Sequence, residues 1–193
     1  MRALVVYESM YGNTRVVASN VADGLRATHE VTLVPVAEAT EDLVAEADLL
    51  VVGGPTHMHG LSSPASRRMA AQAAAKPASG LSLDPDACGP GLRDWLKGLG
   101  PGIGPGIGPG IGTAHALVAA FDTRLNGVAA FTGHAGRGIG KMAKRHGYRL
   151  IADPESFLVG QQNTLLDGEA ARARRWGAAL GVIATSIHFP APA

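Results

Sequence analysis

The stretch that decides the fold is residues 3–14, which read ALVVYESMYGNT. The apolar residues 3–7 predict a strand, and apolar residues at helical spacing predict a helix over 16–25. The first N–H groups of such a helix have no carbonyl partners, and its dipole favours negative charge there. The intervening loop can therefore surround a phosphate without a cation, although an ordinary capped turn would share the pattern. The loop residues are Ser9, Met10, Tyr11, Gly12, Asn13 and Thr14.

The composition is that of a globular α/β protein. The chain has 193 residues, of which 46% are hydrophobic and 17% charged, enough for one domain with a sizeable core. The net charge of +1 is too small to predict nucleic-acid binding, and the single cysteine, Cys88, excludes an intramolecular disulfide. The start lacks a signal-peptide layout, and the apolar segment 176–187 is too short to cross a bilayer. We therefore expect a cytoplasmic protein that binds neither nucleic acid nor a membrane.

Strand-like and helix-like segments alternate along the chain, which predicts a parallel sheet covered by helices. Further strands are expected at 31–36, 49–52, 117–121 and 148–151, with 156–159 as a continuation of the last. Further helices are expected at 64–75, 135–146 and 169–184, with a short helix or turn at 41–47 and a short amphipathic segment at 91–99. Pro35 indicates that the second strand is at an edge or ends there, and Gly147 indicates the end of a helix.

An unusual insert precedes the fourth strand, where Pro-Gly-Ile-Gly occurs three times from Pro101 to Gly112. Glycine at this density cannot hold regular structure, and the unit is far shorter than a solenoid repeat. We expect a mobile surface loop, with an active-site lid as the alternative.

Three loops follow strands that should end at one edge of the sheet, where ligands bind in open parallel sheets. The first is the loop at 9–14, and the other two follow the strands at 49–52 and 117–121. The candidate ligand-binding residues of these two loops are Pro55, Thr56, His57, Met58, His59, Phe121, Asp122, Thr123 and Arg124.

These loops carry a family resemblance. Residues 9–14 (SMYGNT) resemble the FMN-phosphate loop of flavodoxins, in the version with tyrosine before the glycine. Residues 53–56 (GGPT) look like the start of the second flavin loop, as in flavodoxin-like quinone reductases. The segment 121–159 looks like small flavodoxin-domain proteins of actinobacterial type. The resemblance implies a flavodoxin-like, doubly wound five-stranded parallel sheet in the order 2-1-3-4-5. It covers a single domain at 1–187, with the Gly/Pro-rich insert at 100–112 and a C-terminal tail at 188–193.

The resemblance also implies FMN as the cofactor. Loop 9–14 would hold the phosphate, residues 55–59 would flank one side of the ring, and residues 121–124 would approach the other side. The flavin would supply the redox chemistry and the protein its position and hydrogen bonds. The implied function is electron transfer, with a redox partner protein or a small acceptor such as a quinone, by a monomer or homodimer. The alternatives are an FMN-dependent NAD(P)H:quinone reductase and a flavin-free binding or regulatory module of the same fold.

The chain departs from flavodoxins in two respects. Flavodoxins usually sandwich the ring between aromatic side chains, whereas the second loop offers His57, Met58 and His59; a methionine can still pack on a ring. Electron-carrier flavodoxins are also strongly acidic, and a cationic Arg124 near the ring would raise the potential. The densest basic cluster suits a solvated helix face rather than a binding surface. Its members are Arg137, Lys141, Lys144, Arg145 and Arg149.

Other kinds of site have less support. A Walker A motif would need glycine at Ala135 and Ser or Thr at Met142, and a dinucleotide fingerprint would need glycine at Lys141. His57 and His59 could bind a metal, but no third ligand lies nearby in the sequence. The Gly-x-Ser-x-Gly motif of hydrolases is absent. We therefore expect no metal site and assign no catalytic residue.

Overall fold

The computed structural model describes residues 1–77, 79–102, 116–127 and 132–189. The strands are β1 (Arg2–Tyr7), β2 (Glu30–Pro35), β3 (Leu49–His57), β4 (Gly60–Leu61), β5 (Leu117–Leu125), β6 (Arg149–Leu150) and β7 (Glu155–Val159). The helices are α1 (Asn13–Leu25), α2 (Glu41–Ala45), α3 (Pro64–Ala74), α4 (Leu92–Lys97), α6 (Ala135–Arg145) and α7 (Glu169–His188), with a 3₁₀ turn η1 (Val36–Glu38). The repeats that begin at Pro101 lie outside the described residues from residue 103 onward.

The central sheet has the order β2-β1-β3-β5-β6, with its core strands parallel. This confirms the expected doubly wound fold and strand order. Pro35 is the last residue of β2, an edge strand, as its position in the sequence predicted. Gly147 follows α6 with a φ of 88°, which confirms that the helix ends there.

The expected fifth strand is divided into two. β6 pairs with the start of β5, at Leu117 and Val118, and β7 pairs with its last five residues. Pro154, which has no N–H to donate to a sheet ladder, directly precedes β7. The strands β3 and β5 also extend several residues beyond the apolar runs that predicted them. These extensions carry polar residues to the carboxyl edge of the sheet.

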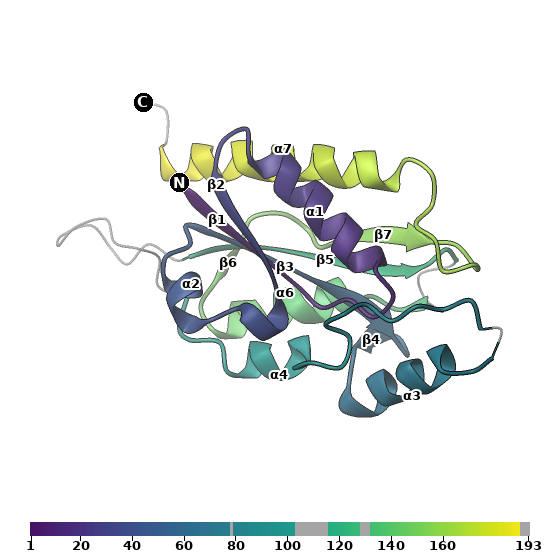
Figure 1. Cartoon of the computed structure of the whole chain (residues 1–193). Coiled ribbons are helices and arrows are strands. Elements are labelled where there is room, and N and C mark those ends of the chain that lie inside the picture. Colours follow the sequence, from purple (N-terminus) through teal and green to yellow (C-terminus); the bar gives the residue numbers. More distant parts are fainter. Residues whose placement is uncertain (78, 103–115, 128–131, 190–193) are drawn as a thin grey trace.

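Helices cover both faces of the sheet (Figure 1). On one face, α1 and α7 enclose a core that contains Val5, Val51, Phe121 and Phe157. On the other, α4 and α6 enclose a second core. The helices α1 and α7 pack very closely, because a Cβ at Gly177 would lie 2.2 Å from the Val21 carbonyl oxygen. This arrangement fixes the start of α1 over the carboxyl ends of the central strands.

Candidate functional site

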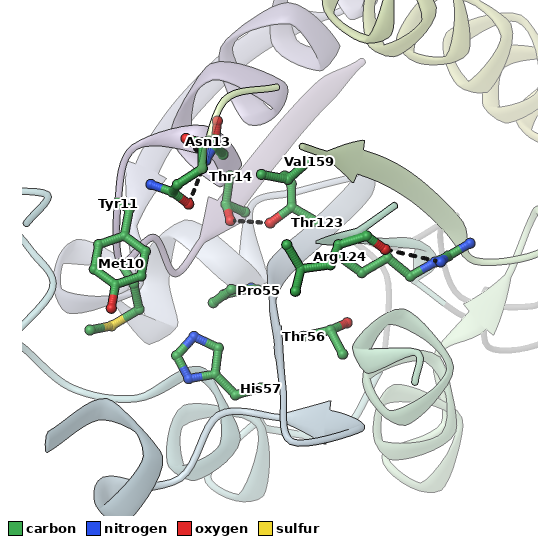
Figure 2. A pocket seen from close by; sticks show the side chains of 12 residues that line it. Met10, Tyr11, Asn13, Thr14, Pro55, Thr56, His57, Thr123, Arg124 and Val159 are labelled. Atoms are coloured by element: carbon green, nitrogen blue, oxygen red, sulfur yellow. Dashed lines mark hydrogen bonds between the residues drawn. The ribbon is translucent and has the colours of Figure 1, made fainter. Parts of the chain in front are cut away.

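A cavity of about 200 Å³ lies at the carboxyl ends of β3, β5 and β7, beside the loop that joins β1 to α1 (Figure 2). All three predicted loops contribute to it, together with the turn after β7. The lining residues are Met10, Tyr11, Asn13, Thr14, Pro55, Thr56, His57, Thr123, Arg124, Leu125, Val159 and Asn163.

Hydrogen bonds between loops hold the first loop in place. The Thr14 and Thr123 hydroxyls lie 2.7 Å apart, both buried, and join α1 to the end of β5. The Asn13 amide donates to the Asn163 backbone carbonyl at 3.0 Å and to its side-chain oxygen at 3.1 Å. The Tyr11 hydroxyl donates to the Ala70 carbonyl of α3 at 2.9 Å. The cavity wall is therefore assembled from residues far apart in the sequence.

Two residues of the first loop shape it without lining the cavity. Gly12 has a φ of 90°, a left-handed conformation that favours glycine. Its N–H donates to the Ser9 hydroxyl at 3.1 Å, and Ser9 itself is buried. This turn directs the chain from β1 into the first turn of α1.

The N-terminus of α1 differs from those of the other helices of more than ten residues. No side chain caps it within the described residues, and its first turn carries no acidic residue. In α3, Ser63 and Ser66 form a reciprocal capping box. In α6, the Ala135 N–H donates to the Thr56 hydroxyl at 3.0 Å and the Gly136 N–H to the Asp122 carboxylate at 2.7 Å.

The longest helix, α7, has Glu169 in its first turn. The first turn of α7 therefore already carries a negatively charged side chain. In α3 and α6, side chains accept hydrogen bonds from N–H groups of the first turn. The first turn of α1 keeps its N–H groups available to an external anion beside the cavity.

The second loop is a tight hairpin between β3 and β4. Met58 and His59 form its turn with φ values of 46° and 73°, and both are exposed, Met58 to 75%. His57 lines the cavity, and burial is the largest cause that lowers its pKa; Arg67 lowers it further and Glu8 raises it. The hairpin thus presents a neutral imidazole to the cavity at neutral pH, whereas Met58 and His59 lie outside its lining.

Of the four residues predicted in the third loop, two line the cavity and two are buried away from it. Thr123 and Arg124 line the cavity. Phe121 is fully buried, with its ring centroid 6.1 Å from that of Phe157 and 6.2 Å from that of Trp176, so it does not reach the cavity. Asp122 is also buried, and its carboxylate accepts from the Gly136 N–H at the start of α6. Burial raises the pKa of Asp122, and it outweighs the hydrogen bonds from Gly136 and Ser156, which lower that pKa.

Arg124 is the one Lys or Arg side chain that lines this cavity in the part of the chain that the structure describes. Its Nη1 donates to the Thr132 hydroxyl at 2.9 Å and to the Gly127 carbonyl at 3.1 Å. These bonds hold the guanidinium at the end of β5, away from the first turn of α1 in Figure 2. Arg124 can therefore add positive potential to the cavity without blocking the start of α1.

Two buried carboxylates that sequence reasoning missed brace the site. The Glu8 side chain accepts from the Ser62 hydroxyl and the Leu92 N–H, both at 2.7 Å, and so links the end of β1 to α4. The Asp84 carboxylate accepts from Arg15 Nε at 3.0 Å, and its backbone N–H donates to the Met10 carbonyl at 2.8 Å. Glu8 could have been predicted to lie near the site, because it is an acidic residue directly after an apolar strand.

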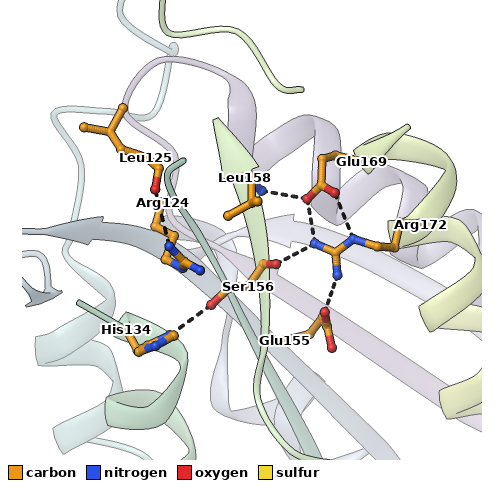
Figure 3. Close-up of polar contacts among 8 residues, drawn as sticks. All are labelled: Arg124, Leu125, His134, Glu155, Ser156, Leu158, Glu169 and Arg172. Atoms are coloured by element: carbon orange, nitrogen blue, oxygen red, sulfur yellow. Dashed lines mark hydrogen bonds and ion pairs between the residues drawn. The ribbon is translucent and has the colours of Figure 1, made fainter. Parts of the chain in front are cut away.

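A network of polar contacts also fixes β7 beside the cavity (Figure 3). Arg172 of α7 makes two hydrogen bonds to Glu169, at 2.9 and 2.6 Å, and also pairs with Glu155. Glu169 in turn accepts from the Leu158 N–H at 2.6 Å, and the Arg172 guanidinium lies 4.4 Å from the centre of the Phe157 ring. The network positions Val159 and the following turn.

Leu125, Val159 and Asn163 were not predicted to line the site. The first two lie at strand ends, and Asn163 has a φ of 55° in the turn after β7. The polar run after the apolar residues 156–159 could have indicated a fourth loop at this edge. Among the described residues, no group of three or more His, Cys, Asp or Glu side chains could hold a metal, and no helix is long and apolar enough to span a bilayer.

Comparison with known proteins gives consistent matches. The family model described as flavodoxin matches residues 5–84, which include the first two loops. A flavodoxin of Aquifex aeolicus (strain VF5) is 46% identical over 59 residues, a match that covers 30% of this chain and 32% of that relative. The chain thus spans about a third of the curated relative it matches.

Solved structures resemble the whole chain. A flavodoxin from the domain Archaea has a TM-score of 0.61 at 18% identity, covering 96% of this chain and 99% of the other. Oxidised Flavodoxin 1 from Bacillus cereus has a TM-score of 0.59 at 14% identity, covering 92% and 95%. The Flv1 flavodiiron core from Synechocystis sp. PCC6803 also has 0.59 at 14%, covering 97% of this chain and 36% of that one. At these identities, the likeness shows the fold.

Proposed function

We propose that this chain is a flavodoxin-like protein that binds FMN in the cavity described above and acts in electron transfer, since residues 5–84 match the flavodoxin family model. The observation that carries the proposal is the uncapped first turn of α1, which opens beside hydroxyl and amide side chains at the cavity. A phosphate placed there would accept hydrogen bonds from backbone N–H groups that have no side-chain acceptor in the part of the chain that the structure describes.

The donor set suits a phosphate ester. The Thr14 hydroxyl and the Asn13 amide can both donate to phosphate oxygens, and Ser9 supports the turn through Gly12. Binding would exchange the Asn13–Asn163 contacts for contacts to the ligand, because the same amide nitrogen donates in both, whereas the Thr14 hydroxyl can donate to a phosphate and still accept from Thr123. The turn at Asn163 would then move away from the first loop.

The remaining cavity residues suit the rest of the cofactor. Pro55, Thr56 and His57 of β3 would lie along one part of it and Thr123 and Arg124 of the adjacent strand β5 along another, since all five residues line the cavity. Bound FMN supplies the redox chemistry. His57 would exclude water from that wall, and Met58, exposed at the hairpin tip, is free to pack on an aromatic ring.

The proposal is tested first by the visible absorption spectrum of the purified protein and by titration of the flavin-free protein with FMN. We expect flavin absorbance bands and quenching of FMN fluorescence that saturates at one equivalent. A protein that shows neither would contradict FMN binding and favour a flavin-free binding module.

A second experiment separates a carrier from a reductase. The FMN-loaded protein is incubated with NADH or NADPH and a quinone, with and without a flavodoxin reductase. For an electron carrier, we expect nicotinamide oxidation only when the reductase is present. Rapid steady-state oxidation without the reductase would instead favour an NAD(P)H:quinone reductase.

A further inference from the structure

The helix α6 lies on the side of the sheet away from α1 and α7 (Figure 1). A groove of about 550 Å³ runs beside it. Four exposed cationic side chains lie along it, with a floor of small and apolar residues and one acidic residue. The lining residues are Arg137, Gly140, Lys141, Lys144, Arg145, Leu150, Asp153 and Pro154.

Acidic and basic residues are unevenly distributed along the chain, although its net charge is close to zero. The segment 123–152 contains no acidic residue, so all 16 Asp and Glu side chains of the protein lie outside it. Its cationic residues are Arg124, Arg137, Lys141, Lys144, Arg145 and Arg149. The four cations of the groove therefore come from a distinctly basic segment, although the net charge of the chain is only +1.

The cations of the groove have no partners among the described residues. Arg15 and Arg172 form ion pairs with carboxylates, but no ion pair or side-chain hydrogen bond involves the four groove cations. The helix dipole accounts for the presence of cations at Lys144 and Arg145, because these residues lie in the last turn of α6, where positive charge is favoured. It does not account for Arg137, which lies in the first turn, where a cation is disfavoured.

The spacing of these four cations in the sequence suited a solvated helix face, but they line a groove, and we propose that the α6 groove is a docking surface for an acidic protein surface. From Arg137 to Arg145 the helix rises about 12 Å, so a row of carboxylates can contact all four cations at once, which one small anion cannot. A single-stranded nucleic acid fits less well, because none of the described lining residues is an aromatic side chain on which a base could stack.

The groove leads toward the candidate cofactor cavity. The first two N–H groups of α6 are bound by Thr56, which lines that cavity, and by Asp122, next to Thr123. A protein docked along α6 would therefore have one end near the cavity. That this protein is the electron-transfer partner rests on the proposed function, whereas the docking surface itself does not.

The test uses the flavin-free full chain, so that it is independent of FMN binding. Poly-L-glutamate and a DNA duplex are titrated separately into the ¹⁵N-labelled protein at low salt, and amide shifts are followed. The groove variant is Lys141→Glu with Lys144→Glu, and the matched control is Arg174→Glu with Arg175→Glu, which makes the same charge change at exposed positions of α7.

We expect poly-L-glutamate to shift amides of α6 and residues 149–154, with at least tenfold weaker binding by the groove variant and less than a twofold change in the control. Equal weakening in both variants, or shifts spread over the whole surface, would overturn the docking surface. Tighter binding of the DNA at equal charge concentration would overturn the assignment to a protein partner. A protein that passes this test but does not bind FMN would refute the proposed function alone.

Discussion

The helices α1 and α3 begin in contrasting ways. At α3, Ser63 accepts from the Ser66 N–H and the Ser66 hydroxyl accepts from the Ser63 N–H, so side chains cap the start of the helix reciprocally. At α1, Gly12 turns the chain in a left-handed conformation, and no side chain of the described residues caps the helix. The difference is the one that we expect if α3 has a purely structural N-terminus and α1 holds the proposed phosphate site. Each prediction below tests this contrast.

The largest effect is expected at Thr14. Replacing Thr14 with Val removes a buried hydroxyl from the proposed phosphate site, and a hydrogen bond to a charged group contributes about 1.5–3 kcal/mol. FMN affinity should therefore fall by roughly ten- to hundredfold, as measured by quenching of flavin fluorescence.

The controls are riboflavin and Arg124→Ala. Riboflavin lacks the phosphate, so Thr14→Val should change its affinity little. Arg124→Ala should weaken FMN less than Thr14→Val, because Arg124 is held at the end of β5 by Thr132 and Gly127. An equal or greater effect of Arg124→Ala would place the phosphate elsewhere.

The next largest effect concerns Asp122, which occupies the start of α6. Asp122→Ala leaves the buried Gly136 N–H without its acceptor, so we expect the free energy of unfolding to fall by about 1–3 kcal/mol in urea. Asp122→Asn keeps an oxygen acceptor and avoids the cost of a buried charge, so it should lose less. Full stability of the Ala variant would show that α6, like α1, tolerates an open first turn.

A smaller effect is expected at Ser63. Ser63→Ala removes the acceptor of the Ser66 N–H and should destabilise the start of α3 by about 1 kcal/mol. Faster amide hydrogen exchange in the first turn of α3 would report it, and Ser63→Asp should restore protection. FMN affinity should not change; a loss comparable to that of Thr14→Val would contradict the contrast between the two helices.

The smallest effect is a pH dependence from His57, which lines the cavity. Burial lowers its pKa below the ordinary 6.5, so the folded state binds fewer protons than the unfolded state as the pH falls below that value. The free energy of unfolding of the flavin-free protein should therefore decline with acidification below about pH 6.5.

His57→Gln should reduce this decline without abolishing it, because burial also lowers the pKa of His29. NMR titration of the imidazole resonances measures the pKa directly. A His57 pKa at or above 6.5 would mean that this wall of the cavity is open to water.

The sequence predicted the layered fold because buried parallel strands are continuous apolar runs and the helices between them have clear periodicity. It could not predict the direction of side chains in β5, since a strand buried on both faces shows no alternation. Phe121 was therefore expected near the ring, whereas the structure places it among Phe157 and Trp176 in the core.

The parts of the candidate site that a short sequence motif determines could be predicted from the sequence. The loop at 9–14 contains the glycine that its left-handed turn requires, and four of its residues line the cavity. The contribution of Asn163 depends on a contact with Asn13 across 150 positions of sequence, and Glu8 depends on α4. Such tertiary contacts leave no periodic signal in the chain.

The most direct test of the account follows the backbone amides of residues 13–15 by ¹⁵N NMR while FMN or riboflavin is added. We predict large shifts of these amides with FMN and small ones with riboflavin, and no difference between the two ligands in the first turn of α3. Equal shifts with both ligands, or none in the first turn of α1, would contradict the claim that this helix start binds the phosphate.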